Sequence, residues 1–247
     1  MPAPRHLREA PITEAIIDIR VKARQGFQPK EFERLRPELS GRFPNVQEQR
    51  SGSITFKFAP TGVVPGSTDQ LILDGFRFST GDGKLLAQFR SDGFTLNRLK
   101  PYPSWEELCP SALELWKIYC SVAAPEGVSR LALRYINQIP LPGDVHEFNR
   151  FLLAPPVIPP ELPQATSAFL TRITIQDQNS RLAAHITQLL AVDTELRKSI
   201  ILDIDAFREG SWSPGSPEIE ATLNQLRVFK NLIFFSSLTE ETLRQFE

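Results

Sequence analysis

The sequence predicts an α+β fold made of a duplicated unit, in which a strand, a helix, an antiparallel meander and a long helix follow one another. Strand-like segments followed by one long amphipathic helix occur over residues 12–123 and again over residues 128–235. Asp92-Gly93 separates two alternating runs, and Asp-Gly between such runs is the strongest short-range signal for a β-hairpin. We therefore expect two lobes, residues 1–124 and 125–247, packed as one unit.

The first strand covers residues 14–21 and has one apolar and one polar face. Ala15, Ile17, Ile19 and Val21 share one face, and Glu14, Asp18 and Arg20 share the other. Because side chains alternate along a strand, this pattern predicts a sheet with one buried face.

The rest of the first half follows the expected unit. Pro29 opens a helix that Pro37 shortens or kinks. A short strand over residues 54–58 and a Pro/Gly-rich loop over residues 59–69 lead into a meander over residues 71–99. Ser104 is the expected N-cap of the long helix that ends this half.

The second half opens with a strand over residues 130–139 and a short helix near residues 146–152. A proline-rich connector over residues 155–163 is extended rather than helical. Strands are expected over residues 169–176, 182–192 and 199–207, followed by a long helix with an apolar stripe of Leu223, Leu226, Phe229 and Ile233. The element order is that of TATA-binding-protein-like or helix-grip folds, an analogy that concerns fold and not function.

Composition indicates a soluble cytoplasmic protein. Apolar residues make up 41% of the 247 residues and charged residues 23%, which is ordinary for a globular chain. No apolar run is long enough to span a membrane, and the first residues lack the hydrophobic core of a signal peptide. Cys109 and Cys120 lie too far apart on one helix to form a disulfide, which fits a reducing compartment.

Charge is distributed unevenly along the chain. Residues 1–100 carry 16 Lys and Arg against 11 Asp and Glu, a balance of +5, whereas residues 101–247 carry 12 against 18, a balance of −6. Opposite lobes favour either a head-to-tail homo-oligomer or an anionic partner for the first lobe, against the alternative of a chance imbalance on a solvated surface. The strongly basic footprint of a nucleic-acid-binding domain is absent.

Several stretches resemble a family of sporadically distributed prokaryotic proteins of about this length and of unknown function. The stretches are Ala10-Pro11-Ile12-Thr13-Glu14-Ala15-Ile16-Ile17-Asp18-Ile19-Arg20, Gly75-Phe76-Arg77-Phe78, Ser91-Asp92-Gly93-Phe94, Tyr102 with Trp105, Leu133-Arg134-Tyr135-Ile136-Asn137 and Leu202-Asp203-Ile204-Asp205. The resemblance covers nearly the whole chain and implies a soluble bacterial or archaeal protein. It brings no activity, cofactor or catalytic residue, and the patchy distribution suits an accessory or defence-linked role.

Two clusters are candidates for a site. If the first strands of the halves lie near a pseudo-twofold axis, Glu14, Asp18 and Arg20 approach either Arg134 or Tyr135 and Asn137, and such a cluster would bind an anionic or peptide ligand. Asp203 and Asp205 project from one face of a strand and are candidate ligands for a divalent metal ion. Structural ion pairs on solvated strand faces are the favoured interpretation of both clusters.

Catalytic templates are absent from the sequence. His6, His146 and His185 are the only histidines and have no metal-ligand spacing, and no P-loop, GxGxxG or GxSxG motif occurs. We therefore predict no catalytic residue and no cofactor, and the leading hypothesis is a non-catalytic binding or adaptor protein that uses a sheet face or the groove between its lobes. A carboxylate-dependent, metal-assisted enzyme centred on Asp203 and Asp205 is the alternative.

Nucleic-acid binding by the first lobe is the third hypothesis. Arg77, Arg90 and Arg98 are interleaved with Phe76, Phe78, Phe89 and Phe94, and arginines with aromatic residues on a sheet are one way to hold single strands. The phenylalanines also have the alternation of a core, which is the favoured interpretation. Trp105 and Trp116 are expected to pack on helix faces, whereas Trp212, in a loop, is the candidate for an exposed aromatic residue.

Overall fold

The computed structural model describes residues 7–52, 54–59, 62–68, 71–143, 145 and 147–247. Its centre is one nine-stranded sheet with the order β2-β5-β6-β7-β1-β8-β11-β10-β9, in which every neighbouring pair is antiparallel. The predicted α+β class and antiparallel pairing are therefore confirmed.

The first half contributes five strands to the sheet, a separate two-stranded hairpin and one long helix. Its elements are β1 (Ile12–Lys22), the 3₁₀ helix η1 (Pro29–Arg34), α1 (Leu35–Leu39), β2 (Asn45–Ser51), β3 (Ile54–Ala59), β4 (Gly62–Thr68), β5 (Ile72–Ser79), β6 (Leu85–Arg90), β7 (Gly93–Leu99) and α2 (Trp105–Ala123).

The second half contributes the other four strands of the sheet. Its elements are β8 (Gly127–Pro140), the 3₁₀ helix η2 (Phe148–Arg150), β9 (Leu170–Asp177), β10 (Leu182–Val192), β11 (Lys198–Trp212), α3 (Glu218–Ser237), α4 (Glu240–Leu243) and the 3₁₀ helix η3 (Arg244–Phe246).

The two halves meet through their first strands. β1 pairs with β8 at the centre of the sheet, with Asp18 opposite Ala132. In each half the last strand of the meander lies beside the first strand, so that β7 flanks β1 and β11 flanks β8. The sheet and its core therefore run without interruption across the expected lobe boundary.

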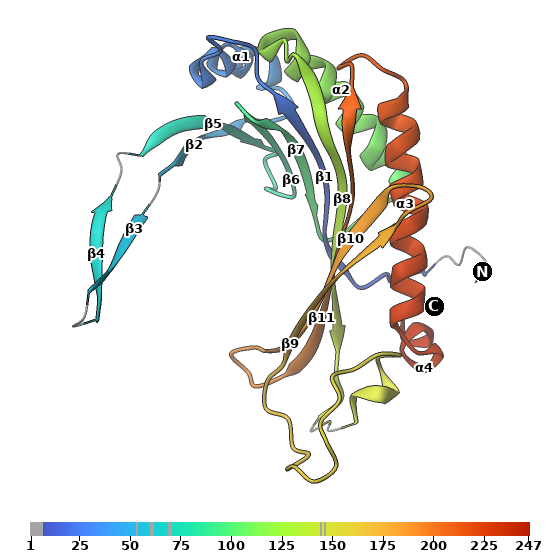
Figure 1. The fold of residues 1–247 in the computed structure, drawn as a ribbon. Coiled ribbons are helices and arrows are strands. Elements are labelled where there is room, and N and C mark those ends of the chain that lie inside the picture. The colour runs from blue at the N-terminus through green and yellow to red at the C-terminus, as the bar shows by residue number, and fades with distance from the viewer. Residues whose placement is uncertain (1–6, 53, 60–61, 69–70, 144, 146) are drawn as a thin grey trace.

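Both long helices cover the same face of the sheet. Figure 1 shows the sheet strongly curved, with α2 and α3 on its convex side and the concave side uncovered by helices. Ala15, Ile17 and Ile19 are completely buried on the helix-covered side. Tyr119 of α2 packs there against Phe89, with ring centroids 6.3 Å apart. The predicted apolar face of the first strand is thus the face that forms the core.

The structure corrects the sequence prediction at β2 and β4. β2 has the sequence NVQEQRS, in which apolar residues do not alternate, so the sequence did not predict a strand there. Antiparallel pairing with β5 nevertheless forms this strand at the edge of the sheet. The expected loop over residues 59–69 contains β4, which pairs with β3, and residues 60, 61 and 69 lie outside the described residues.

Two predictions in the second half were also inaccurate. The helix expected near residues 146–152 is only the 3₁₀ turn η2, and residue 146 lies outside the described residues. Trp212 is 6% exposed, because β11 continues beyond the predicted end and pairs Trp212 with Val128. Trp105 and Trp116 are buried on α2, as predicted.

The start of α2 gives a direct test of local stability. Ser104 Oγ accepts a hydrogen bond from the backbone N–H of Glu107 at 3.2 Å. The backbone N–H groups of the first helical turn have no acceptor within the helix, and the serine oxygen supplies one of them. We therefore expect Ser104→Ala to lower the free energy of unfolding by about 1 kcal/mol. Urea unfolding measures the change. The control is Ser121→Ala near the exposed end of α2, and equal losses in the two variants would contradict the capping role.

Within the described residues, no helix is long and apolar enough to cross a membrane.

Candidate functional site

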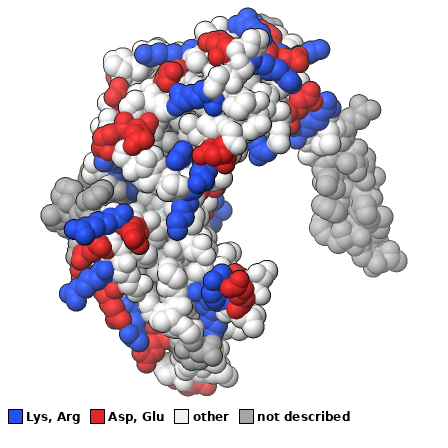
Figure 2. Space-filling view, turned by 180° about the vertical axis from the view of Figure 1, so that it is seen from behind, with Lys and Arg blue, Asp and Glu red and all other residues white. Residues whose placement is uncertain are grey.

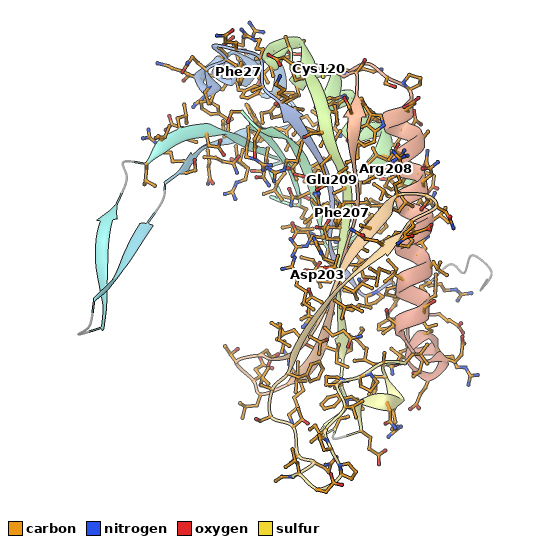
Figure 3. The ribbon with its side chains drawn as sticks, in the orientation of Figure 1. Phe27, Cys120, Asp203, Phe207, Arg208 and Glu209 are labelled. Carbon is orange, nitrogen blue, oxygen red and sulfur yellow. The ribbon has the colours of Figure 1, made fainter. Side chains whose placement is uncertain are left out.

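The concave side of the sheet carries the polar side chains of its strands. We call this surface the open face, and its central residues are Glu14, Asp18, Arg20, Gln88, Arg90, Thr95, Asn97, Arg130, Arg134, His185, Asp203, Asp205 and Phe207. Along each strand, these residues alternate with residues that face the helices. Because alternate side chains of a strand point to the same face, the polar residues of neighbouring strands form one continuous surface. Figure 3 shows Asp203 and Phe207 on the side of β11 that faces away from α3.

Asp18 is the centre of the charge network on the open face. Thr95 Oγ1 donates to Asp18 Oδ1 at 2.7 Å, and Arg20 Nε donates to Asp18 Oδ2 at 2.9 Å. Arg90 and Arg130 approach the same carboxylate at 3.4 and 3.5 Å. Three guanidinium groups therefore surround one carboxylate whose side chain is only 13% exposed.

Other carboxylates balance these arginines on both sides of Asp18. Asp92, in the turn between β6 and β7, pairs with Arg20 and lies 3.1 Å from Arg90 Nε. On the other side, Asp205 of β11 binds Arg130 Nη2 at 2.9 Å. Cations and anions therefore alternate across the strands, and no net charge of either sign accumulates at the centre.

Arg130 also links the network to an aromatic pair. Its guanidinium lies 4.5 Å from the ring centroid of Phe207, and the Phe207 and His185 rings are 4.9 Å apart. His185 Nδ1 is hydrogen-bonded to Thr174 Oγ1 of β9 at 2.9 Å. The network thus reaches the outer strand of the second half.

A chain of amides extends the network into the first half. Glu14 accepts from Asn97 Nδ2 at 2.6 Å, and Asn97 Oδ1 accepts from Gln88 Nε2 at 2.9 Å. Gln88 Oε1 in turn accepts from Gln49 Nε2 of β2 at 2.7 Å and from Arg90 Nη1 at 3.1 Å. The polar side chains of this half hold one another in position.

Ion pairs favour the charged form of two arginines on the open face, Arg134 and Arg20. Arg134 makes a bidentate pair with Asp203, with Nε–Oδ1 and Nη2–Oδ2 distances of 2.8 and 2.5 Å, and this hydrogen bonding raises the arginine pKa despite partial burial. Burial disfavours the charged form of Arg20, but the pairs with Asp18 and Asp92 outweigh it and leave the pKa of Arg20 raised.

The structure brings together only part of the predicted ligand-binding cluster. Glu14, Asp18, Arg20 and Arg134 all lie on the open face. Tyr135 and Asn137 lie on the helix-covered face and are 2% and 1% exposed. Consecutive strand residues point to opposite faces, so Arg134 and Tyr135 cannot belong to one surface.

Asp203 and Asp205 share the open face, as predicted for a carboxylate pair, but each is bound to an arginine. A cation placed between them would have to displace Arg130 and Arg134. Among the described residues, no group of three or more His, Cys, Asp and Glu side chains is arranged to hold a metal ion. His185 is part of the network, while His6 and His146 lie outside the described residues.

The predicted aromatic platform for nucleic acid is part of the core. Phe76, Phe78, Phe89 and Phe94 are at most 1% exposed beneath the helices, where no base can stack on them. Figure 2 shows basic and acidic side chains intermixed over the visible surface rather than a field of one sign. The core interpretation of the phenylalanines is therefore confirmed.

A second candidate site lies on the other side of the sheet, between the two halves. A cavity of about 870 Å³ opens between the start of β1, the loop before α2, the end of β8 and α3. We call it the inter-lobe cavity, and the lining residues used below are Tyr102, Trp105, Tyr135, Asn137, Arg227 and Lys230. The two predicted residues missing from the open face, Tyr135 and Asn137, are thus found here.

Tyrosines and cations give the inter-lobe cavity its chemistry. The Tyr135 hydroxyl donates to the Tyr102 hydroxyl at 2.8 Å, and burial raises the pKa of both phenols, so both stay neutral. Arg227 pairs with Glu106 at 3.1 Å and lies 5.6 Å from the ring centroid of Trp105. Because the Tyr102 hydroxyl accepts this hydrogen bond, its own proton can be donated to a further acceptor.

Lys230 is the residue of this cavity that the sequence analysis missed. It is 8% exposed, and its Nζ lies 3.8 Å from the ring centroid of Tyr135. Desolvation by burial, together with repulsion from Arg227, lowers the pKa of Lys230 to about 7. Phe229 of the predicted stripe is partly buried against the core, and Lys230, four positions after Leu226, is buried as well. In the sequence, a lysine at a position of the helix where apolar residues recur could have pointed to this buried cation.

The open face therefore offers a preformed array of paired charges, and the inter-lobe cavity offers cations, phenols and aromatic rings around a partly open space. On the open face, Thr174 Oγ1 lies 2.9 Å from Nδ1 of His185, the one hydroxyl–imidazole pair among the described residues. The chain matches no protein-family model, and a search of curated proteins finds no relative either.

Proposed function

We propose that this protein is a non-catalytic binding or adaptor protein whose open face receives a segment of a protein partner that carries both acidic and basic side chains. The observation that supports this most strongly is the concave sheet face left uncovered by both long helices and lined by mutually paired charges (Figure 1). A helix or loop of a partner fits a concave surface better than a flat one does.

Preorganisation supports the proposal. Arg90 and Arg130 are held by acidic neighbours, and their side chains are only 12% and 23% exposed. Immobilising a flexible side chain on binding costs about 0.5–1.5 kcal/mol. Since these arginines are already ordered in the free protein, a partner bound to them avoids most of that cost.

Exposed apolar residues in the second half of the chain also favour a protein partner. They gather in the connector after η2 and at the ends of β9, β10 and β11, and they are Leu153, Val157, Leu162, Leu170, Val192 and Leu196. Interfaces combine such apolar anchors with a polar surround. A nucleic acid would instead favour an excess of basic residues, which the alternation of Arg and Asp excludes at the centre of the face.

The proposal includes a duplicated origin of the fold. The two halves have the strand orders β1-β7-β6-β5-β2 and β8-β11-β10-β9 when read outward from the centre, and in each half a long helix on the convex side follows the last strand. This correspondence supports a pseudo-twofold, TATA-binding-protein-like saddle. The free thiols of Cys109 and Cys120 support a cytoplasmic location, which we propose with it.

Charge reversal on the open face tests the proposal. We expect tagged protein purified from its native host to carry a stoichiometric protein partner, and Arg134→Glu to reduce its recovery by about tenfold or more, because a carboxylate there repels Asp203 and any acidic partner group. Quantitative mass spectrometry measures recovery, and binding is then repeated with the purified partner.

The matched control is Lys117→Glu, an equal charge reversal on the exposed side of α2, which should keep the partner. Circular dichroism confirms that both variants are folded. Loss of the partner in both variants, or retention in Arg134→Glu, would contradict a role for the open face. Recovery of nucleic acid that dissociates between low and physiological salt would favour the third hypothesis instead.

A further inference from the structure

We propose that the inter-lobe cavity is a binding site for a small organic anion with a flat, unsaturated body, whose charged group is received by Lys230 and Arg227. This site is separate from the open face, because it lies on the helix-covered side of the sheet and shares no residue with the charge network. It would therefore give the protein a second, small-molecule ligand.

The charge of the cavity lining selects for anions. Among the described residues, the lining carries the cations Arg8, Lys100, Arg227 and Lys230 and the anions Glu9 and Glu106, a balance of +2. This excess stands out because residues 101–247, which supply three of these six groups, carry a balance of −6 as a whole. A cleft of one sign with low-dielectric walls concentrates ligands of the opposite charge.

Lys230 has no counter-ion in the described part of the chain. Its ammonium group makes no ion pair or hydrogen bond there and contacts only the face of Tyr135. A buried charge without a partner destabilises a protein, and an apolar residue at this position of α3 would be more stable. A bound carboxylate or phosphate would supply the missing partner, with a charge-assisted hydrogen bond in a partly desolvated site.

The walls of the cavity suit a flat body. Tyr102 and Phe235 are the partly exposed aromatic residues of the lining, and Trp105, Tyr135 and Phe234 also line it with side chains that are at least nine-tenths buried. The Tyr102 hydroxyl accepts from Tyr135 and so is free to donate its own proton to a ligand oxygen. Ser104 and Trp105 add the N-terminal end of the long helix α2, whose dipole attracts negative charge.

Reaction with pyridoxal 5′-phosphate tests the site, because this probe joins a phosphate to an aromatic aldehyde. An unprotonated amine attacks the aldehyde carbon, water leaves, and borohydride reduces the imine to a stable secondary amine that peptide mass spectrometry locates. At pH 7, about half of the Lys230 side chains are unprotonated, against less than about 0.1% of an ordinary lysine. We expect Lys230 to be labelled at least about tenfold faster than exposed Lys117.

Competition between the probe and small ligands then shows whether the cavity recognises an anion or whether Lys230 is simply a reactive amine. Benzoate should slow the labelling of Lys230 several-fold, whereas benzamide, the neutral molecule of the same shape, should not. Arg227→Gln should remove the protection by benzoate, and Arg244→Gln, outside the cavity lining, should leave it unchanged. Labelling of Lys230 no faster than Lys117, or equal protection by benzoate and benzamide, would overturn the proposal.

Discussion

Replacing Asp18 by alanine is expected to lower the free energy of unfolding by about 3 kcal/mol, since removal of one partner from a largely buried ion pair leaves the others uncompensated. Arg20, Arg90 and Arg130 all contact the Asp18 carboxylate, and Thr95 would lose its acceptor as well. Guanidinium chloride would mask the electrostatic contribution, so urea unfolding at low salt is the appropriate measurement.

Two further variants show whether charge or position is responsible. Asp18→Asn keeps an oxygen for Thr95 and should lose less stability than Asp18→Ala. Asp92→Asn removes a carboxylate that also contacts Arg20 and Arg90 but is 53% exposed, and should cost less than about 1 kcal/mol. A loss in Asp92→Asn as large as that in Asp18→Ala would show that Asp18 is not the centre of the network.

Replacing Lys230 by methionine is expected to stabilise the protein by roughly 4–5 kcal/mol below pH 7, because an unbranched apolar side chain has no ammonium to desolvate. Between pH 7 and the ordinary lysine pKa, the unfolded chain binds a proton at this residue that the folded chain does not. The stability of the wild-type protein relative to the variant therefore rises with pH across this window.

Urea unfolding of both proteins from pH 6 to pH 10 measures the effect. The advantage of Lys230→Met should decline by about 1.4 kcal/mol per pH unit above pH 7 and vanish as the ordinary lysine pKa is approached. Lys117→Met, at an exposed position of α2, is the control and should show no such slope. Parallel stability curves for Lys230→Met and the wild-type protein would show that the ammonium is not desolvated.

The alternation of apolar and polar residues predicted strands correctly where one face of the strand is buried along its length. The alternation in residues 14–21 predicted both the strand and its polar face, and β10 was predicted to its terminal residues because apolar positions recur along its whole length. It failed at β2, whose polar sequence becomes a strand only through backbone pairing with β5. It also failed for Trp212, since the continuation of β11 depends on its pairing with β8 rather than on its own composition.

The amino-acid sequence by itself determined the α+β class, the antiparallel meanders, the two long helices and the polar character of Glu14, Asp18, Arg20, Arg134, Asp203 and Asp205. Only the tertiary structure decided how these residues are used. The pairing of β1 with β7 and β8, and of β8 with β11, brought them onto one face of the sheet, and the alternation of side chains along β8 separated Arg134 from Tyr135. The inter-lobe cavity was decided in the same way, because its walls come from segments far apart in sequence that meet only when both halves share one sheet.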